Sequence, residues 1–340
     1  MSFKKIINIE NKKIGDDNPC YIIAEAGVSH FGDFELAKDL VDMSCESGAD
    51  VFKTQIFNVD ELISKNAEEW KTRLRPRNLS FSQIESLKER CEKKGLIFLA
   101  TAHDESRLEW LKKLNVSSVK IGSGEKNNYD FIKKLGFLKK PLIISTGMYN
   151  NKEVKNLLEL CFKNKFYEII LLHCVTSYPV PLDQINLSAM DQMKKYFPGP
   201  IGYSDHSKDG SAILAAVARG AKVIERHITI LKNVPNAQDW KVSSTPKNFP
   251  RLIKNVRSIE KMIGNKKKDV LPCENNGVKW ALKSLVASSN LSKGKKILEK
   301  DIQAKRPGTG IPPIEKDKII GRKLKKSMLE GDFFDFDNLI

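Results

Sequence analysis

Two histidines of this chain stand at matching positions in neighbouring apolar runs. His206 ends the run PIGYSDH, and His227 stands near the end of KVIERHIT, 21 residues later. If both runs are parallel strands of one barrel, the two imidazoles meet at its C-terminal mouth, where such folds carry their active sites. Two neutral imidazoles with open coordination positions suit Mn²⁺, Mg²⁺, Fe²⁺ or Zn²⁺ acting as a Lewis acid toward a carbonyl group. The pair therefore predicts one metal-binding site.

Polar residues also stand near the C-terminal ends of nearly all the apolar runs. They are Glu25, Lys53, Gln55, Thr101, His103, Lys120, Ser123, Glu125, Ser145, Thr146, His173, Thr176, Tyr178, Ser204, Asp205 and Glu225. Lysines beside hydroxyls and backbone amides suit a ligand that carries a phosphate and a carboxylate. Glu25 and Glu125 are candidates for proton transfer or for binding hydroxyl groups. A single Glu after a strand is more often solvated than catalytic, and Glu225 could simply pair with Arg226 or Arg219.

The elements that must position these residues alternate between short apolar runs and amphipathic segments, as in βα units. The eight apolar runs cover residues 21–27, 50–57, 96–103, 118–122, 141–148, 168–175, 200–206 and 222–229. Several helical patterns begin with the capping residues Asp33, Ser80 and Asp104. Eight units in about 260 residues fit a TIM (β/α)8 barrel. A doubly wound dinucleotide-binding sheet fits less well, because no GxGxxG motif follows the first run. The predicted fold class is α/β.

The pattern changes near Ile263. We predict a barrel domain over residues 1–265, a polar linker over 266–283 and a small β-rich domain over 284–340, where Gly and Pro punctuate short strand patterns. A domain of under ~70 residues has a marginal core and is usually stabilised by docking. The expected docking surface is the barrel mouth of its own chain or of a partner.

Composition limits the possible function classes. The 340 residues carry a formal charge of +16, but the lysines are scattered through helical patterns among glutamates, which is typical of a solvated surface. We therefore expect no nucleic-acid partner, while attraction of an anionic small molecule stays open. The six cysteines form no CxxC pair and are expected to be reduced. No apolar run is long enough to span a bilayer and no signal peptide is evident, so we expect a cytoplasmic protein without a membrane partner.

The chain resembles the sialic acid synthase family, which condenses phosphoenolpyruvate with an N-acylated sugar aldehyde. The resemblance covers almost the whole chain through the motifs IAEAGVSHFGD, FKTQ, KIGSGEKNN, STGM, LHCVTSYP, IGYSDHS, VIERHIT and KRPGTGI. It implies an N-acetylneuraminate synthase-type transferase, with a TIM barrel joined to a C-terminal antifreeze-like (SAF) domain. It also implies a domain-swapped homodimer in which the tail of one subunit covers the active site of the other.

The resemblance implies a role for each matching residue. His206 and His227 would bind manganese or magnesium, which polarises the sugar aldehyde as C3 of phosphoenolpyruvate attacks it. Glu125 would activate the water that attacks C2, after which phosphate leaves with C–O cleavage. Arg306 would come from the partner subunit and contact the N-acyl group. The residues implied to bind phosphoenolpyruvate are Lys53, Thr101, Lys120, Ser123, Ser145 and Ser204, and those implied to bind the sugar are Glu25, Gln55, Tyr178 and Asp239.

The chain also departs from the family pattern. ATAH replaces the frequent STPF and brings His103 to the rim, and GVSH has Ser29 where an asparagine commonly stands. Residues 236–244 keep Asp239 without the usual glycine context. We expect His30 to orient the first loop, and His173 and Cys174 to be packed strand-end residues rather than ligands.

Four cations follow the second run and bear on the substrate. Lys71, Arg73, Arg75 and Arg77 are either solvated or receive a phosphorylated sugar. In the second case, replacing Arg75 or Arg77 by Ala should raise KM selectively for the phosphorylated sugar. The SDH form of the seventh-run motif resembles bacterial members and favours an unphosphorylated substrate.

Alternative functions remain open. Legionaminate, pseudaminate and 9-phosphate-forming sialate synthases share the implied sites and differ in the sugar. Another phosphoenolpyruvate-dependent 3-deoxy sugar acid synthase, or an aldolase with Lys120 as its Schiff-base lysine, would fit the same barrel. A protein of another class, a non-catalytic saccharide-binding protein, would use the SAF-like tail for recognition.

Overall fold

The structure is a computed structural model that describes residues 2–265 and 267–340. The chain divides into two units, Met1–Gly264 and Asn265–Ile340, and each has a hydrophobic core of its own. None of the helices in the described part of the chain is long and apolar enough to cross a membrane.

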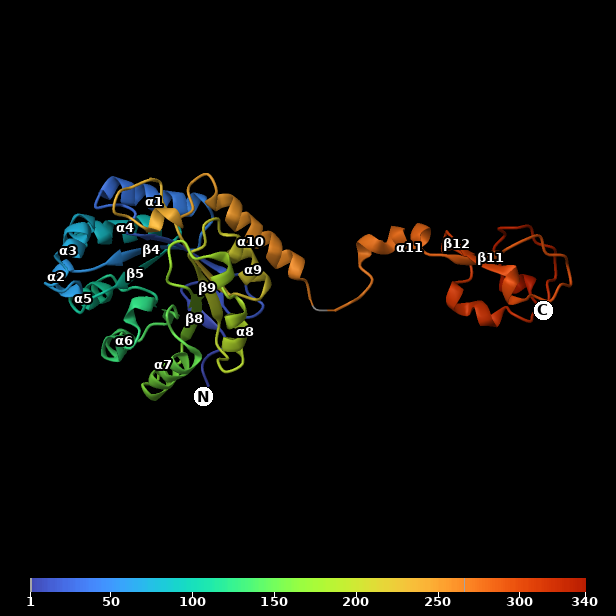
Figure 1. Cartoon of the computed structure of the whole chain (residues 1–340), viewed down its shortest axis with the longest axis horizontal. Helices are drawn as coiled ribbons and strands as arrows, with labels where there is room; N and C mark the ends of the chain where they lie inside the picture. The colour runs from blue at the N-terminus through green and yellow to red at the C-terminus, as the bar shows by residue number, and fades with distance from the viewer. Residues whose placement is uncertain (1, 266) are drawn as a thin grey trace. The chain divides into compact units, whose positions relative to one another are not determined.

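Eight parallel strands form the centre of the first unit (Figure 1). Their hydrogen-bonded order is β5-β4-β3-β10-β9-β8-β7-β6, and β5 and β6, at the two ends of this order, also lie side by side. Each strand lies within one of the eight apolar runs, so the predicted TIM-like barrel is confirmed. The strands are β3 (Tyr21–Gly27), β4 (Val51–Ile56), β5 (Ile97–Ala102), β6 (Val119–Ile121), β7 (Leu142–Ser145), β8 (Ile169–Cys174), β9 (Ile201–Asp205) and β10 (Val223–His227).

Helices connect the strands and surround them. Asp33 and Ser80 cap α1 and α4 as predicted, because their side chains accept hydrogen bonds from backbone N–H groups of the first turn. The N-cap of α5 is Glu105, but the carboxylate of Asp104 still accepts from the backbone N–H of Arg107. The helices are α1 (Phe34–Glu46), α2 (Val59–Leu62), α3 (Glu68–Leu74), α4 (Phe81–Lys93), α5 (Ser106–Lys113), α6 (Tyr129–Gly136), α7 (Asn151–Lys163), α8 (Ser188–Lys194), α9 (Ser211–Ala218) and α10 (Phe249–Ile263).

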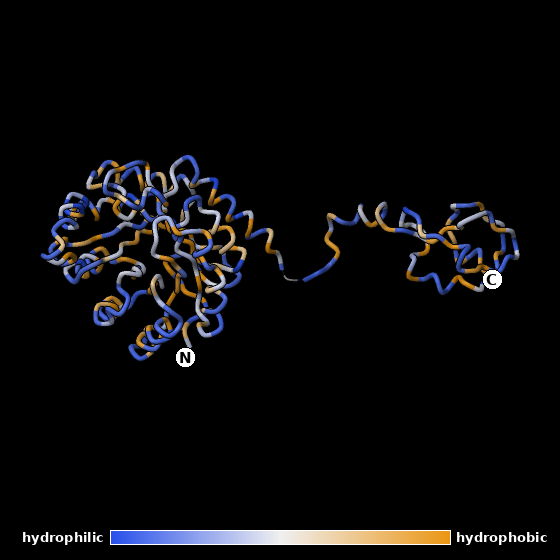
Figure 2. The backbone as a smooth tube through the Cα atoms, viewed as in Figure 1, coloured by the Kyte–Doolittle hydropathy of each residue, from blue (hydrophilic) through white to orange (hydrophobic). Residues whose placement is uncertain are grey.

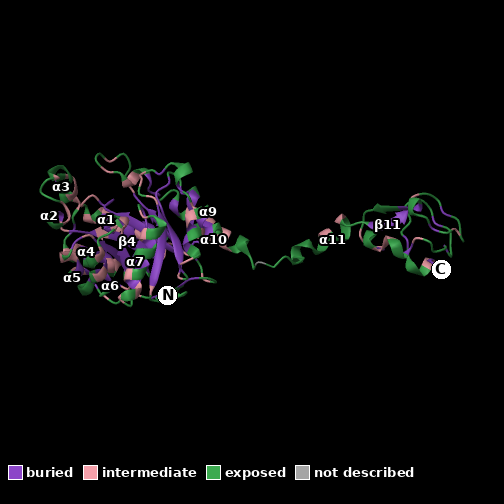
Figure 3. Cartoon of the chain, turned by 60° about the horizontal axis from the view of Figure 1, so that its bottom comes forward, coloured by how far each residue is buried: buried purple, intermediate pink, exposed green. Residues whose placement is uncertain are grey.

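Side chains alternate along each strand between the barrel interior and the helix layer. Apolar residues follow the strands in Figure 2, and the strands of the first unit are buried in Figure 3. An antiparallel hairpin of β1 (Ile7–Ile9) and β2 (Lys12–Ile14) shares an interior cluster with residues that begin strands, such as Tyr21, Val51 and Val223. The hairpin therefore closes the N-terminal end of the barrel. The opposite end is left for polar groups.

The second unit is small and has little regular structure. β11 (Ser284–Ala287) pairs in antiparallel fashion with β12 (Ile302–Lys305) over a core that includes Leu291, Ile297 and Phe334. The segment that we predicted as a linker contains α11 (Asn275–Ala281), and Lys266 lies outside the described residues.

Candidate functional site

The candidate functional side chains belong to the set of strand residues that face the barrel interior. On several strands the series that begins with apolar residues ends with polar ones at the C-terminal end. The series are Ile23 then Glu25 on β3, Val51, Lys53 and Gln55 on β4, Leu99 then Thr101 on β5, Ile143 then Ser145 on β7, and Val223, Glu225 and His227 on β10. The period of two thus lines the same interior with a hydrophobic core below and charged groups above.

Two lysines and two carboxylates form a cluster inside this end of the barrel. Lys53 Nζ lies 2.7 Å from Glu25 Oε2 and 3.5 Å from Glu225 Oε1, and Lys120 Nζ lies 3.6 Å from Glu225 Oε2. All four side chains are at most 5% exposed. Lys120 also donates to Ser145 Oγ at 2.8 Å. The cluster therefore holds two cations in the barrel interior.

Burial and neighbouring charges shift the pKa values of this cluster in different directions. Burial alone would lower the pKa of Lys53, but Glu225 and Glu25 raise it above its ordinary value. For Lys120 burial outweighs Glu225, with Lys53 acting in the same direction as burial, so the pKa is lowered. Burial would raise the pKa of Glu225, but Lys120 and Lys53 outweigh it and hold the carboxyl ionised.

The position of Glu225 corrects our reading of the sequence. Arg226 pairs with Asp205, and Arg219 pairs with Asp191, so neither arginine is the partner of Glu225. Glu225 instead faces both lysines and accepts a hydrogen bond from Ser204 Oγ at 3.4 Å. The sequence analysis overlooked the spacing between Glu225 and His227. Two residues that are two positions apart on one strand face the same side, so Glu225 must face the barrel interior as His227 does.

Neutral donors gather beside the lysines. The backbone N–H of Gly147 donates to Ser123 Oγ at 3.0 Å. A Cβ on Gly147 would lie 2.3 Å from Thr176 Oγ1 and 2.6 Å from Ser123 Oγ, so only glycine fits there. Thr101 Oγ1 is buried and has no hydrogen-bond partner among residues 2–265 and 267–340. These groups would supply uncharged hydrogen bonds to a phosphate or a carboxylate.

The two histidines lie next to each other, as the sequence predicted for one barrel. Their ring centroids are 5.4 Å apart, and the ring of Tyr178 lies 4.1 Å from that of His206. His206 Nδ1 lies 2.7 Å from the carbonyl oxygen of Val175, which fixes Nδ1 as the donor of the neutral ring and leaves Nε2 with its lone pair. Burial and the neighbouring His227 lower the pKa of His206 to about 3, so the ring is neutral at pH 7.

The donor set around the histidines fits a metal ion that is completed by other ligands. A backbone carbonyl bound to the second ring nitrogen, as for His206, is the usual support of a metal-binding histidine. His227 Nδ1 is buried without a hydrogen-bond partner in the described part of the chain, and Asp239 Oδ2 lies 3.8 Å away. No group of three or more His, Cys, Asp or Glu residues within 2–265 and 267–340 could hold a metal by itself. The protein would therefore supply two imidazoles, and substrate or water the rest.

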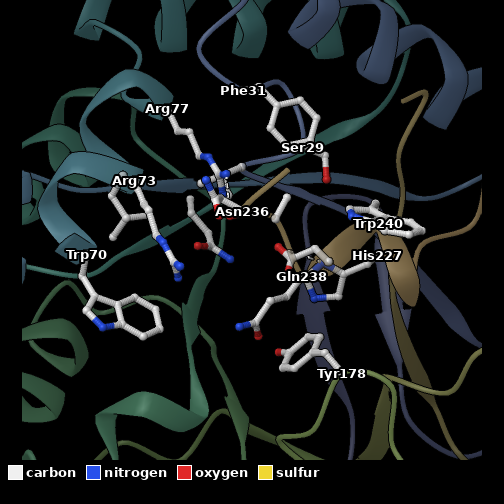
Figure 4. Close-up of a pocket in the computed structure, with 15 residues that line it drawn as sticks. Ser29, Phe31, Trp70, Arg73, Arg77, Tyr178, His227, Asn236, Gln238 and Trp240 are labelled. Carbon is white, nitrogen blue, oxygen red and sulfur yellow. Dashed lines mark hydrogen bonds and ion pairs between the residues drawn. The ribbon is translucent and has the colours of Figure 1, made fainter. Parts of the chain in front are cut away.

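A cavity of about 250 Å³ opens beside His227 (Figure 4). Aromatic and polar side chains line it together: Val28, Ser29, Phe31, Gln55, Trp70, Arg73, Leu74, Arg77, Tyr178, His227, Asn236, Ala237, Gln238, Asp239 and Trp240. Three of the predicted sugar-binding residues are in this wall, and the fourth, Glu25, accepts from Gln55 Nε2 at 3.1 Å. The aromatic residues Phe31, Trp70 and Trp240 were missed, because they lie on loops and short helices without a periodic signal.

The four cations after β4 have different surroundings. Lys71 and Arg75 both pair with Asp60 and share its single negative charge. Arg73 and Arg77 line the cavity, and Arg77 donates to the carbonyl oxygen of Asn236 at 2.8 Å. The structure therefore makes Arg77 a candidate substrate contact. Arg75 pairs with Asp60 and does not line this cavity.

Glu125 and His103 lie at the ends of two adjacent strands. Asn128 Nδ2 donates to Glu125 Oε2 at 2.8 Å, and His103 Nδ1 lies 4.0 Å from Glu125 Oε1. Burial raises the pKa of Glu125, an effect that the hydrogen bond from Asn128 opposes. Burial, together with Lys53 and Lys120, lowers the pKa of His103 to about 4. The rim thus carries a carboxylate and a neutral imidazole side by side.

The residues that we expected to be structural are packed. His173 Nε2 contacts the carbonyl oxygen of Ile185 at 2.8 Å, and Cys174 is buried. His30 Nδ1 accepts from the backbone N–H of Gly32 at 3.1 Å, in agreement with a role in the first loop. All six cysteines are free.

Arg306 belongs to the second unit. Its guanidinium lies over the ring of Trp280 at 5.6 Å, and Ser284 Oγ donates to the carbonyl oxygen of Pro307, the next residue, at 2.7 Å. The KRPG segment is therefore held against α11 and β11.

Comparisons with known proteins agree with this arrangement. Residues 40–268 match the NeuB family, and residues 283–340 match the SAF domain. The N,N'-diacetyllegionaminic acid synthase of Campylobacter jejuni is 36% identical over 92% of this chain and 97% of that protein. The N-acetylneuraminate-9-phosphate synthase of Homo sapiens is 34% identical over 94% and 92%. The crystal structure of N-acetylneuraminic acid (sialic acid) synthetase from Leptospira borgpetersenii, in complex with citrate, has a TM-score of 0.76 and 34% identity over 82% of this chain and 96% of that one.

Proposed function

This chain belongs to the NeuB family of nonulosonic acid synthases, and we propose that it condenses phosphoenolpyruvate with an N-acylated hexose to give a nonulosonic acid and phosphate. The observation that carries the proposal is the buried pair Lys53 and Lys120, with its hydroxyl and amide donors, beside the histidine pair and the sugar-sized cavity. One half of the site suits a small phosphorylated acid. The other half suits a polar ring with acyl groups.

The residues of the interior would bind phosphoenolpyruvate. Lys53 and Lys120 would contact its phosphate and carboxylate, and Ser123, Ser145, Ser204 and Thr101 would add neutral hydrogen bonds. Both lysines already have fixed positions, because Glu25, Glu225 and Ser145 hold them. Such preorganisation lowers the cost of ordering these long side chains when substrate binds.

The reaction forms one C–C bond and breaks one C–O bond. C3 of phosphoenolpyruvate attacks the aldehyde carbon of the open-chain sugar, and the aldehyde oxygen takes up a proton, for which the ion pair of Lys53 and Glu25 is our candidate donor. Water then adds to C2 and gives a proton to Glu125. The tetrahedral intermediate finally expels phosphate, which takes the proton from Glu125, and the C2 hydroxyl loses its own proton to the Lys53–Glu25 pair as C2 becomes the ketone.

A divalent ion, Mn²⁺ or Mg²⁺, bound by His206 and His227 would supply Lewis-acid polarisation of the aldehyde oxygen. The neutral state of His206 and the buried free nitrogen of His227 support this part of the proposal. Tyr178 packs against both rings and would keep them in place as the sugar enters.

The cavity wall supports an acylated hexose, N-acetylmannosamine or a related 2,4-diacetamido sugar. Trp70, Phe31 and Trp240 offer apolar surface to acyl methyl groups, while Gln55 and Asp239 offer partners for hydroxyls. Arg77 has a backbone carbonyl as its polar partner. This observation favours a hexose phosphate as the second candidate, and the name of the human relative points the same way.

The second unit enters the proposal through Arg306. We propose a domain-swapped homodimer in which the partner's SAF domain brings this arginine to the N-acyl group. The match of residues 283–340 to the SAF domain supports it. The cytoplasm, where phosphoenolpyruvate is available, remains the predicted location.

Phosphate release tests the proposed function. The purified protein is incubated with phosphoenolpyruvate, Mn²⁺ and one of three acylated hexoses, N-acetylmannosamine, its 6-phosphate or 2,4-diacetamido-2,4,6-trideoxymannose. Phosphate is measured and the sugar acid is identified by mass spectrometry. We expect release with one acylated hexose, loss on EDTA treatment, recovery with Mn²⁺, and loss in His206→Ala and His227→Ala. Full activity in both variants would contradict the metal site.

The aldolase alternative has its own test. The lowered pKa of Lys120 is compatible with an amine nucleophile. Borohydride reduction with pyruvate would then label Lys120 covalently. We expect no label. Labelling of Lys120 would contradict the proposed synthase reaction and support an aldolase.

A further inference from the structure

We propose that His103 and Glu125 jointly position the water molecule that adds to C2. This inference rests on the proposed function and deepens it. Glu125 has one carboxylate oxygen held by Asn128, while the other faces His103 Nδ1 at 4.0 Å. His103 follows β5 and Glu125 ends the short turn after β6, and these two strands lie side by side.

The separation of the two groups suits one shared water molecule. At 4.0 Å, His103 Nδ1 and Glu125 Oε1 are too far apart for a direct hydrogen bond. A water oxygen at about 2.8 Å from each atom would see them at an angle of roughly 90°, which a water molecule accommodates. The pair can therefore hold a water between them without moving the backbone.

The chemistry of the two groups would orient this water for attack. A neutral imidazole offers one acceptor nitrogen, and an ionised carboxylate is an acceptor only. A water that donates one hydrogen to each has its lone pairs directed away from both, toward a substrate carbon. A lysine in place of His103 could only donate a hydrogen bond to the water. A second carboxylate could accept one, but it would place another negative charge beside Glu125.

The surroundings keep His103 in the form that this role needs. The titratable groups that face it are Lys53, Lys120 and Glu125. The two lysines disfavour a third positive charge, so the imidazole stays neutral at pH 7 and can accept. Its side chain is 23% exposed, so water can reach it.

The proton balance closes with the residues present. As the water oxygen forms its bond to C2, one of its protons passes to Glu125, and the hydrogen bond to His103 holds the oxygen in line. When the C2–O bond to phosphate breaks, protonated Glu125 gives its proton to the departing phosphate. The C2 hydroxyl loses its remaining proton as the ketone forms, and this proton restores the one that the Lys53–Glu25 pair gave to the aldehyde oxygen. His103 acts on the attacking water, so it affects turnover rather than substrate binding.

Two substitutions separate this role from simple packing. His103→Phe keeps a planar ring, as in the STPF form of the motif, but has no acceptor. His103→Asn places an amide oxygen close to the position of Nδ1. We expect His103→Phe to lower kcat roughly 10- to 100-fold, with KM for both substrates and the Kd of phosphoenolpyruvate changed less than about twofold, and His103→Asn to recover part of the loss.

A double variant tests whether the two residues act on the same water. We expect His103→Phe to have little further effect in a Glu125→Gln background, because the oriented water is already lost. Multiplicative effects would overturn the inference, as would wild-type kcat in His103→Phe. A raised Kd of phosphoenolpyruvate with unchanged kcat would assign His103 to the anion site instead. If the wild-type protein releases no phosphate with any acylated hexose, the proposed function fails and this inference with it, whereas the other contradictory results overturn this inference alone.

Discussion

Lys53, Lys120, Glu25 and Glu225 place four ionisable groups within one layer of the barrel interior. Isolated charges in such surroundings would be costly, but each group here has an opposite partner within 3.6 Å. The arrangement keeps the lysines in place, and the Thr101 hydroxyl, which has no hydrogen-bond partner in the described part of the chain, could receive a ligand. Most of the polar residues that face the barrel interior could be predicted from the sequence, because side chains alternate with a period of two along each strand. Glu225 was missed because it was read as a single residue rather than as part of the series that ends at His227.

The raised pKa of Glu125 gives a prediction for the pH dependence of turnover. Glu125 must be ionised to accept a proton from water, so kcat falls as pH drops through its pKa. Burial places this pKa above the ordinary value of about 4.3. We expect an acid limb in a profile of kcat against pH, with its midpoint above that value, and its disappearance together with most of the activity in Glu125→Gln. A midpoint at or below the ordinary value would contradict the assigned base.

Arg77 and Arg75 form a matched pair for substrate choice. If the substrate is a hexose phosphate, Arg77→Ala should raise its KM about tenfold or more, since a charged hydrogen bond is lost. Arg75→Ala should have little effect, because Arg75 pairs with Asp60. Steady-state kinetics with N-acetylmannosamine and its 6-phosphate check this. Equal effects of Arg77→Ala on both sugars would exclude a phosphate contact.

The elements that carry the histidines are joined behind the site. Arg226 on β10 pairs with Asp205 on β9, both at most 1% exposed, and Arg226 also donates to Ser244 Oγ and the carbonyl oxygen of Ser207. This network lies next to His206 and His227 in sequence and fixes the distance between their strands. Strands and their order followed from the apolar runs. The cavity wall did not, because Trp70, Phe31 and Trp240 come from connections whose conformation depends on long-range contacts.

Two arginine–aspartate pairs allow a comparison of buried and exposed interactions. Arg226→Met should reduce the free energy of unfolding by about 3–5 kcal/mol, because it leaves Asp205 buried and unpaired. Arg219→Met removes the exposed pair with Asp191 and should cost about 0–1 kcal/mol. Urea denaturation followed by circular dichroism measures both. Equal shifts of the midpoint would show that the buried pair does not stabilise the barrel as described.

At the scale of the whole molecule, the chain combines a barrel that holds the lysine cluster and the histidine pair with a SAF unit that has its own core. The sequence indicated both parts, through the regular βα alternation and its end near Ile263. Their mutual placement in an oligomer could not follow from periodicity, because it depends on surfaces rather than on local patterns. The proposed exchange of Arg306 between subunits therefore needs a test of its own.

Complementation between two inactive variants provides that test. His206→Ala damages the barrel site, and Arg306→Ala damages the tail. In a mixed domain-swapped dimer, one site combines the intact barrel with the intact tail. After random subunit exchange, half of the dimers are mixed, and we expect about a quarter of wild-type activity. Activity no higher than that of the separate variants would show that Arg306 does not act on the partner's site.

The fate of the bridging oxygen of phosphoenolpyruvate tests the central claim most directly. Phosphoenolpyruvate labelled with ¹⁸O between C2 and phosphorus is turned over with the preferred sugar, and both products are examined by mass spectrometry. Addition of water to C2 followed by C–O cleavage predicts that each released phosphate carries the label. Label retained in the organic product, with unlabelled phosphate, would mean cleavage of the P–O bond and would contradict the proposed synthase reaction.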